Sequence, residues 1–399
     1  MSRPEQAFED VRWPASFNEI PKDVFHRQDV YRRELERIFY GPMWHPVAHV
    51  SEVPEKGNYK TIQLGEAPVL VVRGDDGIVR AFFNSCAHRG TQLRTCSRGT
   101  GKEIECPYHR WVFSNQGELM SAPGMPRFPN DFAKQKFGLT QLRTGEVAGL
   151  IFATCSKDAP GLEAFLGVAK DGIFKALGGD GRLELLGYQK VVYDTNWKEY
   201  NDNEGYHAPL LHSAFRLLRW GGGKGTQCQT PFGHQVIEAE LRTSPNNGFL
   251  DDYSLVELKS SDGQPKSHVI ALFPMVNVIN HLDTINIRFA MPVSVDQTEV
   301  HYAYFSHQDD SEALAKHRLR QASNLLGPSG FISLEDGAVF NRVHVGSNAL
   351  GRVTFVKGVD DPEREEPTGD NPVYVEQNDE AGNPIKWDYY RRVMGFERE

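Results

Sequence analysis

Two short motifs of metal-binding residues lie in residues 85–111, which read SCAHRGTQLRTCSRGTGKEIECPYHRW. The first motif is Cys86-Ala-His88, and the second is Cys106-Pro-Tyr-His109. A structural zinc finger usually takes its two cysteines from one arm and its two histidines from another. Here each arm offers one thiolate and one imidazole, so each arm could serve two different metal atoms.

This donor set suits a [2Fe–2S] cluster in which two cysteines hold one iron and two histidines hold the other, the Rieske type. Neutral imidazoles leave such a cluster less negative than four thiolates do. Its reduction potential is therefore roughly −150 to +300 mV, compared with about −400 mV for the all-cysteine type. We predict a Rieske cluster held by these four residues, and a structural zinc site built from mixed arms is the alternative.

A pair of histidines follows in residues 196–215, NWKEYNDNEGYHAPLLHSAF. The spacing of His207 and His212 corresponds to about 140° around an ideal helix, which is poor for sharing one metal. Pro209 lies between them and would kink a helix, which can bring the two imidazoles together. Two histidines and one carboxylate, with positions left open, form the facial triad of non-haem Fe(II) oxygenases. The pair therefore predicts an Fe²⁺ site where O₂ and a small-molecule substrate meet.

The carboxylate of this triad must come from another part of the chain. Residues 327–339, GPSGFISLEDGAV, place Asp336 where strand or loop sequence gives way to helical sequence, with Glu335 beside it. An acid in the first turn of a helix is also stabilised by the helix dipole. A purely structural role for Asp336 is therefore the alternative. We predict Asp336 as the third ligand, with Glu335 as its rival.

The composition is that of an ordinary globular protein, with 399 residues, 24% charged and 39% hydrophobic, which predicts two or three domains. The net charge of −9 argues against nucleic acid and anionic membranes as partners, because both favour a basic surface. No apolar run approaches the roughly 20 residues that span a bilayer. The first ten residues, MSRPEQAFED, lack the apolar stretch of a secretory signal. We therefore expect a cytoplasmic protein without a disulfide framework.

The pattern of helices and strands divides the chain into three regions. Residues 1–45 read as a polar helical segment that packs on the catalytic domain. Residues 46–155 contain short β-branched or aromatic runs, VLVVRG, VRAFFN and LIFATC, with turn residues between them, which predicts an all-β domain. Residues 156–399 mix long strands with helices, which predicts an α+β catalytic domain.

Four segments of the third region carry more specific predictions. Residues 161–177, GLEAFLGVAKDGIFKAL, predict one helix, and residues 311–327, SEALAKHRLRQASNLLG, predict another. The glycine-rich GGGKG at 221–225 lacks the spacing of a phosphate-binding loop and reads as a flexible loop. The acidic, proline-rich stretch 359–384 reads as a surface extension.

Together these motifs resemble the α subunit of the Rieske non-haem iron ring-hydroxylating oxygenases. The likeness covers most of the chain, and residues 319–339, LRQASNLLGPSGFISLEDGAV, are most similar to the terephthalate and aromatic-acid types. The resemblance implies an all-β Rieske domain beside a catalytic domain with a large antiparallel sheet and covering helices. It also implies a [2Fe–2S] cluster, an Fe²⁺ ion and electrons that reach the chain from NADH through a ferredoxin, a flavin reductase or both.

The resemblance further implies a homotrimer, alone or with a small β subunit in an α₃β₃ assembly. In such a ring the cluster of one subunit reduces the iron of its neighbour through a bridging acid, which lies three residues before the first histidine. That position is Glu204 here, where the family usually has aspartate. The stretch from Trp197 to His207 looks shorter than in relatives, which leaves Asp202 as a rival bridge. Glutamate at this place occurs in relatives that act on quaternary amines.

Few residues indicate the substrate. Three apolar side chains after the histidine pair could line a pocket for an aromatic ring or belong to the core: Phe215, Leu218 and Trp220. Arg288 interrupts an apolar strand, TINIRFAMP, and could fork onto a substrate carboxylate or form a structural ion pair.

We therefore predict hydroxylation of an aromatic, carboxylate-bearing substrate. Hydroxylation or demethylation of a quaternary or N-methyl amine is the runner-up. Two other classes stay open at this point: a Rieske electron carrier without catalysis, and a zinc-stabilised binding protein.

Overall fold

The structure is a computed structural model that describes residues 10–202, 208–213, 221–242, 256–260, 266–359, 367 and 371–399. The chain divides into two compact units. The smaller unit is Phe39–Pro160, and the larger unit combines Met1–Ile38 with Gly161–Glu399. Within the described ranges, no helix is both long enough and apolar enough to span a bilayer.

The smaller unit is built from three antiparallel sheets, as its short β-branched runs predict. The largest sheet has the order β5-β4-β3-β6, from β3 (Asn58–Leu64), β4 (Ala67–Arg73), β5 (Val79–Phe83) and β6 (Arg98–Thr100). A second sheet joins β2 (His45–His49), β10 (Arg143–Val147) and β11 (Leu150–Thr154). The third joins β7 (Ile104–Glu105), β8 (Val112–Phe113) and β9 (Leu119–Ser121).

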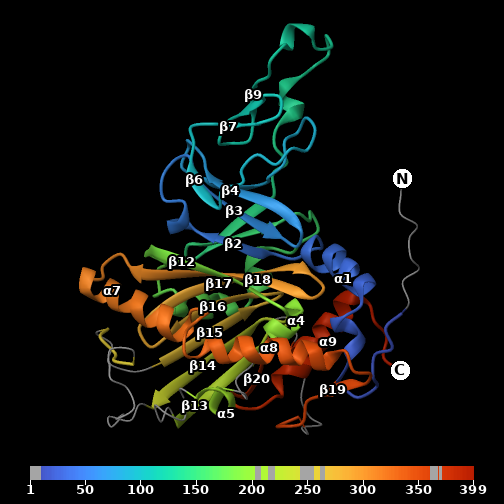
Figure 1. Ribbon diagram of the computed structural model, residues 1–399, viewed down its shortest axis with the longest axis vertical. Helices are drawn as coiled ribbons and strands as arrows, with labels where there is room; N and C mark the ends of the chain where they lie inside the picture. Colours follow the sequence, from blue (N-terminus) through green and yellow to red (C-terminus); the bar gives the residue numbers. More distant parts are fainter. Residues whose placement is uncertain are drawn as a thin grey trace. The chain divides into compact units, whose positions relative to one another are not determined.

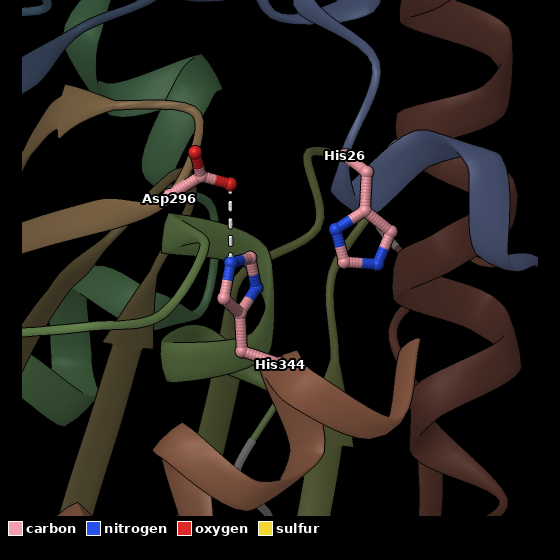
Figure 2. Close-up of side chains that lie close together, drawn as sticks. All are labelled: His26, Asp296 and His344. Atoms are coloured by element: carbon pink, nitrogen blue, oxygen red, sulfur yellow. Dashed lines mark hydrogen bonds and ion pairs between the residues drawn. The ribbon is translucent and has the colours of Figure 1, made fainter. Parts of the chain in front are cut away.

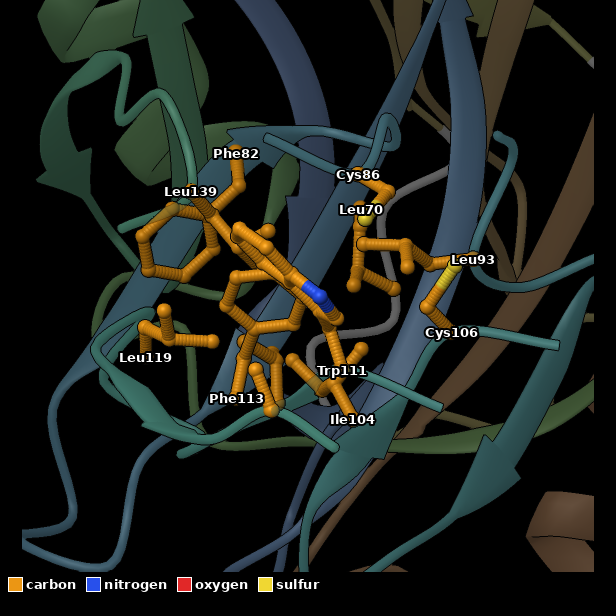
Figure 3. Packing of buried hydrophobic residues seen from close by; sticks show 12 residues of the cluster. Leu70, Phe82, Cys86, Leu93, Ile104, Cys106, Trp111, Phe113, Leu119 and Leu139 are labelled. Carbon is orange, nitrogen blue, oxygen red and sulfur yellow. The ribbon is translucent and has the colours of Figure 1, made fainter. Parts of the chain in front are cut away.

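An aromatic and aliphatic core holds the two predicted cluster loops of this unit in place. Phe82 and Phe113 are fully buried within it, and Trp111 is nearly so. Cys86 and Cys106 belong to the same cluster and lie together at one side of it (Figure 3). The loops that carry the two motifs are therefore anchored by packing.

The larger unit contains one eight-stranded antiparallel sheet in the order β12-β18-β17-β16-β15-β14-β13-β20 (Figure 1). Its first four strands in sequence are β12 (Leu183–Tyr193), β13 (Gly221–Gln229), β14 (Gln235–Arg242) and β15 (Lys266–Leu272). The others are β16 (Val276–His281), β17 (Thr284–Ser294), β18 (Gln297–His307) and β20 (Val373–Glu376). A separate pair, β1 (Glu19–Pro21) and β19 (Arg352–Thr354), links distant parts of the chain.

Helices cover both faces of this sheet. On one face α3 (Ala169–Ala176) packs so closely that a Cβ atom on Gly172 would lie 3.0 Å from the side chains of Val236 and Ile270. The other face is covered by η7 (Ala322–Leu326), which packs on Ile279. η7 continues α7 (Glu312–Gln321) and is followed by α8 (Ser333–Ser347) (Figure 1). Other helical segments described in this unit include η1 (Lys22–Phe25), α1 (Gln28–Glu34), η2 (Leu35–Phe39), α2 (Leu162–Leu166), α4 (Trp197–Asn201), α5 (Ala208–Leu211) and α9 (Gly382–Met394).

Three local predictions were wrong. Residues 161–177 form two helices, α2 and α3, because Gly167 between them has a φ of 51° that ends the first helix. Residues 221–225 begin strand β13 instead of forming a loop. The stretch 359–384 is more than a surface extension, because β20 within it pairs with β13 and its last residues begin α9 with buried side chains.

Candidate functional site

The two cluster motifs form matching turns in the smaller unit. In the first, the N–H of Cys86 donates to the carbonyl of Thr91 (2.9 Å), and the N–H of Gly90 donates to the carbonyl of Cys86 (2.9 Å). In the second, the N–H of Cys106 donates to the carbonyl of Trp111, and the N–H of Arg110 donates back to Cys106. The fourth residue after each cysteine is left-handed, with φ of 74° for Gly90 and 57° for Arg110.

The four donors of these turns converge, with the cysteines inside and the histidines outside. The two thiols are within hydrogen-bonding distance of each other. The rings of His88 and His109 lie with their centroids 4.7 Å apart. Cys86 is 3% exposed and Cys106 is 1% exposed, whereas His88 is exposed and His109 is half-buried. A cluster bound here would have one iron in the interior and the other at the surface.

The chemistry of these donors fits a Rieske cluster better than a zinc ion. The donors are arranged as a thiolate pair and an imidazole pair, as two different iron atoms require. Burial opposes ionisation of Cys106, but hydrogen bonds from the backbone N–H groups of Tyr108 and His109 and from the side chains of Cys86 and Thr91 together lower the pKa of its thiol. Such N–H groups also tune the potential of a cluster by bonding to its sulfur ligands.

His212 lies directly after α5, is buried, and faces two consecutive acids of α8. Its Nε2 is 3.4 Å from Oδ1 of Asp336, and its Nδ1 is 3.5 Å from Oε2 of Glu335. Glu335 also accepts a hydrogen bond from the backbone N–H of Ser213 (2.8 Å). This geometry lets His212 and Asp336 share a metal ion, while Glu335 orients the ring from its other nitrogen. The predicted partner His207 lies outside the described residues.

Asp336 lies in the first turn of α8, which agrees with either a metal-ligand role or a helix-dipole role. Its burial, however, is greater than a helix-dipole role requires. It is only 5% exposed and belongs to the buried face of α8. Burying a carboxylate is costly unless a cation or hydrogen-bond donors pair with it. Its Oδ1 lies 3.4 Å from Nε2 of His212, so a metal ion could be bound by both side chains.

Arg288 in β17 lies beside this pair. Its guanidinium lies over the ring of Tyr302 (5.0 Å), and its Nη2 donates to the carbonyl of Leu326 (3.1 Å) and to Oγ of Ser333 (3.0 Å). Burial opposes ionisation, but Tyr302 and, more weakly, Asp336 raise the pKa of Arg288. Its Nε is buried and has no hydrogen-bond partner in the part of the chain that the structure describes. The Nε–H of this buried guanidinium is therefore able to donate a hydrogen bond to a bound ligand.

A second polar residue on the same face, Asn286, belongs to no motif by which it could have been predicted. Side chains two apart in a strand share a face, so Asn286 lies beside Arg288. Asn286 is fully buried, and neither atom of its amide has a partner among the described residues. Its cross-strand partner is Ile279, which is two residues before His281 on that face. Burial, with His212 and Arg288 nearby, lowers the pKa of His281 to about 4, so this imidazole is neutral.

In the register of β16 and β17, Asn286 therefore lies between His281 and Arg288 on this face of the sheet. Each buried polar group left without a partner costs about 1–3 kcal/mol. The amide of Asn286 is therefore able to pair with a polar group of a bound ligand.

Asp202, the rival bridging acid, is bound within the larger unit. It ends α4, and its Oδ1 accepts hydrogen bonds from Nδ2 of Asn383 (3.0 Å) and Nε1 of Trp387 (3.0 Å). Nζ of Lys386 lies 3.2 Å from the same oxygen. Burial raises the pKa of Asp202, although Lys386 opposes the shift. The other predicted residues, Glu204, Phe215, Leu218 and Trp220, lie outside the described residues.

Both units match known protein families. The Rieske [2Fe–2S] domain family matches residues 43–140, and the catalytic domain of the ring-hydroxylating alpha subunits matches residues 181–374. The large subunit of anthranilate 1,2-dioxygenase from Burkholderia cepacia is 34% identical over 359 residues, which cover 82% of this chain and 84% of that subunit. The chain belongs to the Rieske ring-hydroxylating oxygenases.

Other relatives agree with this membership. The large oxygenase component of salicylate 5-hydroxylase from Ralstonia sp. is 29% identical over 423 residues, covering 97% of each chain. The crystal structure of naphthalene 1,2-dioxygenase from Rhodococcus sp. has the same fold, with a TM-score of 0.82, 23% identity and 94% of each chain covered. The predicted family, fold class and pair of cofactors, a Rieske cluster and a mononuclear iron, are confirmed. This Rieske oxygenase is therefore an enzyme, which removes the electron carrier and the zinc-stabilised binding protein as alternatives.

Proposed function

We propose that this Rieske oxygenase hydroxylates an aromatic carboxylate, using O₂ and electrons that originate from NADH. Arg288 carries this proposal, because a buried guanidinium with an unpaired Nε–H is suited to a forked pair with a carboxylate. It bonds to Ser333, which precedes Asp336 by three residues in α8, so a substrate held there would lie near the proposed iron site. The relatives named for anthranilate and salicylate support the same substrate class.

We assign the metal ligands from the donor geometry and the motifs. Cys86, His88, Cys106 and His109 would hold the cluster, and His207, His212 and Asp336 would hold the iron. When bound, the two groups supply single electrons and the activation of O₂. Glu335 would hold the ring of His212 in the orientation that leaves Nε2 facing the metal.

The chain's own contribution is to orient the substrate in a dry site. Arg288 would fix the carboxylate, and Asn286 would pair with a second polar group on the ring. Anthranilate and salicylate each carry a hydrogen-bonding group ortho to the carboxylate, which suits two binding residues side by side on one strand. We therefore infer an ortho-substituted benzoate as the preferred substrate.

A quaternary amine is the runner-up, and Glu204 is the feature that favours it. The described residues argue against it in two ways. A fixed cation, Arg288, lies beside the proposed iron site and would repel a quaternary ammonium group. The ring of Tyr302, which could belong to an aromatic cage, is already covered by the same guanidinium.

A substrate comparison tests the proposed function. The iron-loaded enzyme, supplied with NADH and a compatible ferredoxin and reductase, is expected to couple O₂ uptake to product formation with salicylate and anthranilate. Unsubstituted benzoate should be turned over less efficiently, and a trimethylammonium compound should not be hydroxylated or demethylated. Turnover of the trimethylammonium compound alone, with both metal sites filled, would overturn the assignment.

We propose that the enzyme works as a homotrimer in which Glu204 links the cluster of one subunit to the iron of its neighbour. Asp202 is less suited to this role, because its carboxylate already bonds to α9. Glu204→Gln should leave both metal sites filled and the cluster reducible, yet lower product formed in a single turnover by at least ~10²-fold.

Asp202→Asn is the matched control for this relay. It should keep most of the single-turnover yield, although it weakens the contact with Lys386. Full turnover in Glu204→Gln would show that the relay assignment is wrong, and loss in Asp202→Asn alone would transfer the role to Asp202.

A further inference from the structure

Three side chains with metal-binding chemistry converge in the larger unit, outside the proposed iron site. They are His26 after η1, Asp296 in the turn between β17 and β18, and His344 in α8. One ligand atom from each lies within 4.8 Å of the others. Figure 2 shows the two imidazoles and the carboxylate grouped together, with Nε2 of His344 3.2 Å from Oδ1 of Asp296. His344 is two helical turns beyond Asp336 in α8, which is about 12 Å along the axis.

A buried carboxylate holds His344 in this orientation. Oε2 of Glu199 lies 2.7 Å from Nδ1 of His344, which leaves Nε2 directed at Asp296. Glu199 is itself fixed, because Oγ of Ser347 (2.5 Å) and the backbone N–H of Asn196 (3.1 Å) donate to it. A carboxylate behind a histidine is the usual outer support of a metal-bound imidazole.

His26 has hydrogen-bonding capacity that the described residues do not use. Its ring lies with its centroid 5.1 Å from that of His344. Its Nε2 is buried and has no hydrogen-bond partner among the residues that the structure describes.

We propose that His26, Asp296 and His344 form a site for a divalent transition-metal ion of the zinc type, with water as a further ligand. Two imidazole nitrogens and one carboxylate oxygen suit Zn²⁺, whereas Ca²⁺ and Mg²⁺ prefer oxygen ligands. Tetrahedral ligands about 2.0–2.1 Å from zinc are about 3.4 Å apart. The contact between His344 and Asp296, at 3.2 Å, already has that separation.

A metal ion at this site would join three separate segments of the larger unit. It would tie the residue after η1 and the β17–β18 turn to the later half of α8, whose first turn carries Asp336. Glu199 would connect the same site to α4, which precedes the histidine segment in the sequence. The ion would therefore brace the helix that supplies a proposed iron ligand, without taking part in the redox chemistry.

Zinc binding by the iron-loaded full chain tests this site. After equilibration with Zn²⁺ alone and removal of the free metal, elemental analysis should find one equivalent of zinc per chain and no loss of iron. Zinc should also raise the thermal midpoint of the enzyme. His26→Ala and Asp296→Asn should each lower the zinc affinity by at least ~10-fold and reduce the gain in thermal midpoint.

Asp309→Asn provides a matched control. Asp309 and Asp296 are both exposed carboxylates of the larger unit, with side-chain exposures of 72% and 63%, but Asp309 pairs with Arg182 instead. This variant should bind zinc as the parent does, and unchanged iron content would show that all three variants fold. The proposal is wrong if the parent takes up no zinc, if zinc enters only as iron leaves, or if all variants bind it equally.

Discussion

Replacing Asp336 by asparagine is expected to empty the mononuclear iron site and lower product formation by at least ~10³-fold, while the Rieske cluster stays in place. The proposed iron site has three protein ligands, and Asp336 is the one that carries a negative charge. An amide oxygen in its place cannot supply that charge. Loss of a catalytic metal removes several kcal/mol of transition-state stabilisation, which corresponds to a rate factor of about this size. Iron content, the cluster's EPR signal and product yield should be measured on the same sample.

Glu335→Gln is the matched control, because Glu335 is the next residue and faces the other nitrogen of His212. Because Glu335 only supports the ring of His212, the Glu335→Gln variant should bind iron ~10–100-fold more weakly but still turn over when Fe²⁺ is in excess. The opposite pattern, with iron lost from Glu335→Gln and retained by Asp336→Asn, would make Glu335 the ligand.

The second large effect is expected at Arg288. Hydrogen bonds to charged groups contribute about 1.5–3 kcal/mol each, so losing a forked pair to a carboxylate should lower kcat/KM by ~10²-fold or more. Arg288→Gln should therefore raise KM for an aromatic acid strongly. Iron content and the cluster signal should remain those of the parent, because Arg288 is not a proposed metal ligand.

Two further variants separate substrate binding from structure. Ser333→Ala removes one protein partner of Arg288 (3.0 Å) but keeps the guanidinium, so KM should change little. Asn286→Ala should reduce kcat/KM for salicylate more than for benzoate, since only salicylate offers an ortho hydroxyl group. Equal losses for both acids in Asn286→Ala would remove Asn286 from substrate recognition, and an unchanged KM in Arg288→Gln would remove Arg288.

The cluster loops could be proposed from the sequence because the information there is local. Each arm carries its cysteine and histidine within four residues, and the turn that follows depends on short backbone hydrogen bonds. The left-handed conformation of Gly90 could be expected, since glycine adopts it at little cost. The same conformation at Arg110 could not, because it is set by the fold around the second turn.

The proposed iron site was harder to predict because its parts are distant in sequence. His212 and Asp336 meet only after β13–β18 have formed one sheet and α7, η7 and α8 have packed on it. Asp336 and Glu335 are neighbours of the same charge, so only the structure shows that they face different nitrogens of His212. Asn286 has no motif at all; it is distinguished by a buried amide without partners.

Two of the three wrong local predictions have a similar cause. Glycine-rich residues 221–225 read as a loop by themselves, but β14 pairs with them and makes them a strand. The acidic stretch 359–384 looked too polar for the interior, yet β20 completes the sheet by backbone pairing with β13, which does not require apolar side chains. Partners far away in the chain outweigh local composition at both places.

The contact between Glu199 and His344 couples α4, which leads into the histidine segment, to α8, which carries Asp336. Ser347 lies at the far end of α8, about 16 Å along the helix axis from Asp336. Its hydroxyl donates a hydrogen bond to Glu199 and so strengthens the contact between Glu199 and His344. A substitution at Glu199, His344 or Ser347 would therefore loosen both segments that supply the proposed iron ligands. When a variant of this chain loses activity, substitutions along the whole length of α8 should be considered, because a substitution in its last turn is expected to have the same effect as one in its first turn.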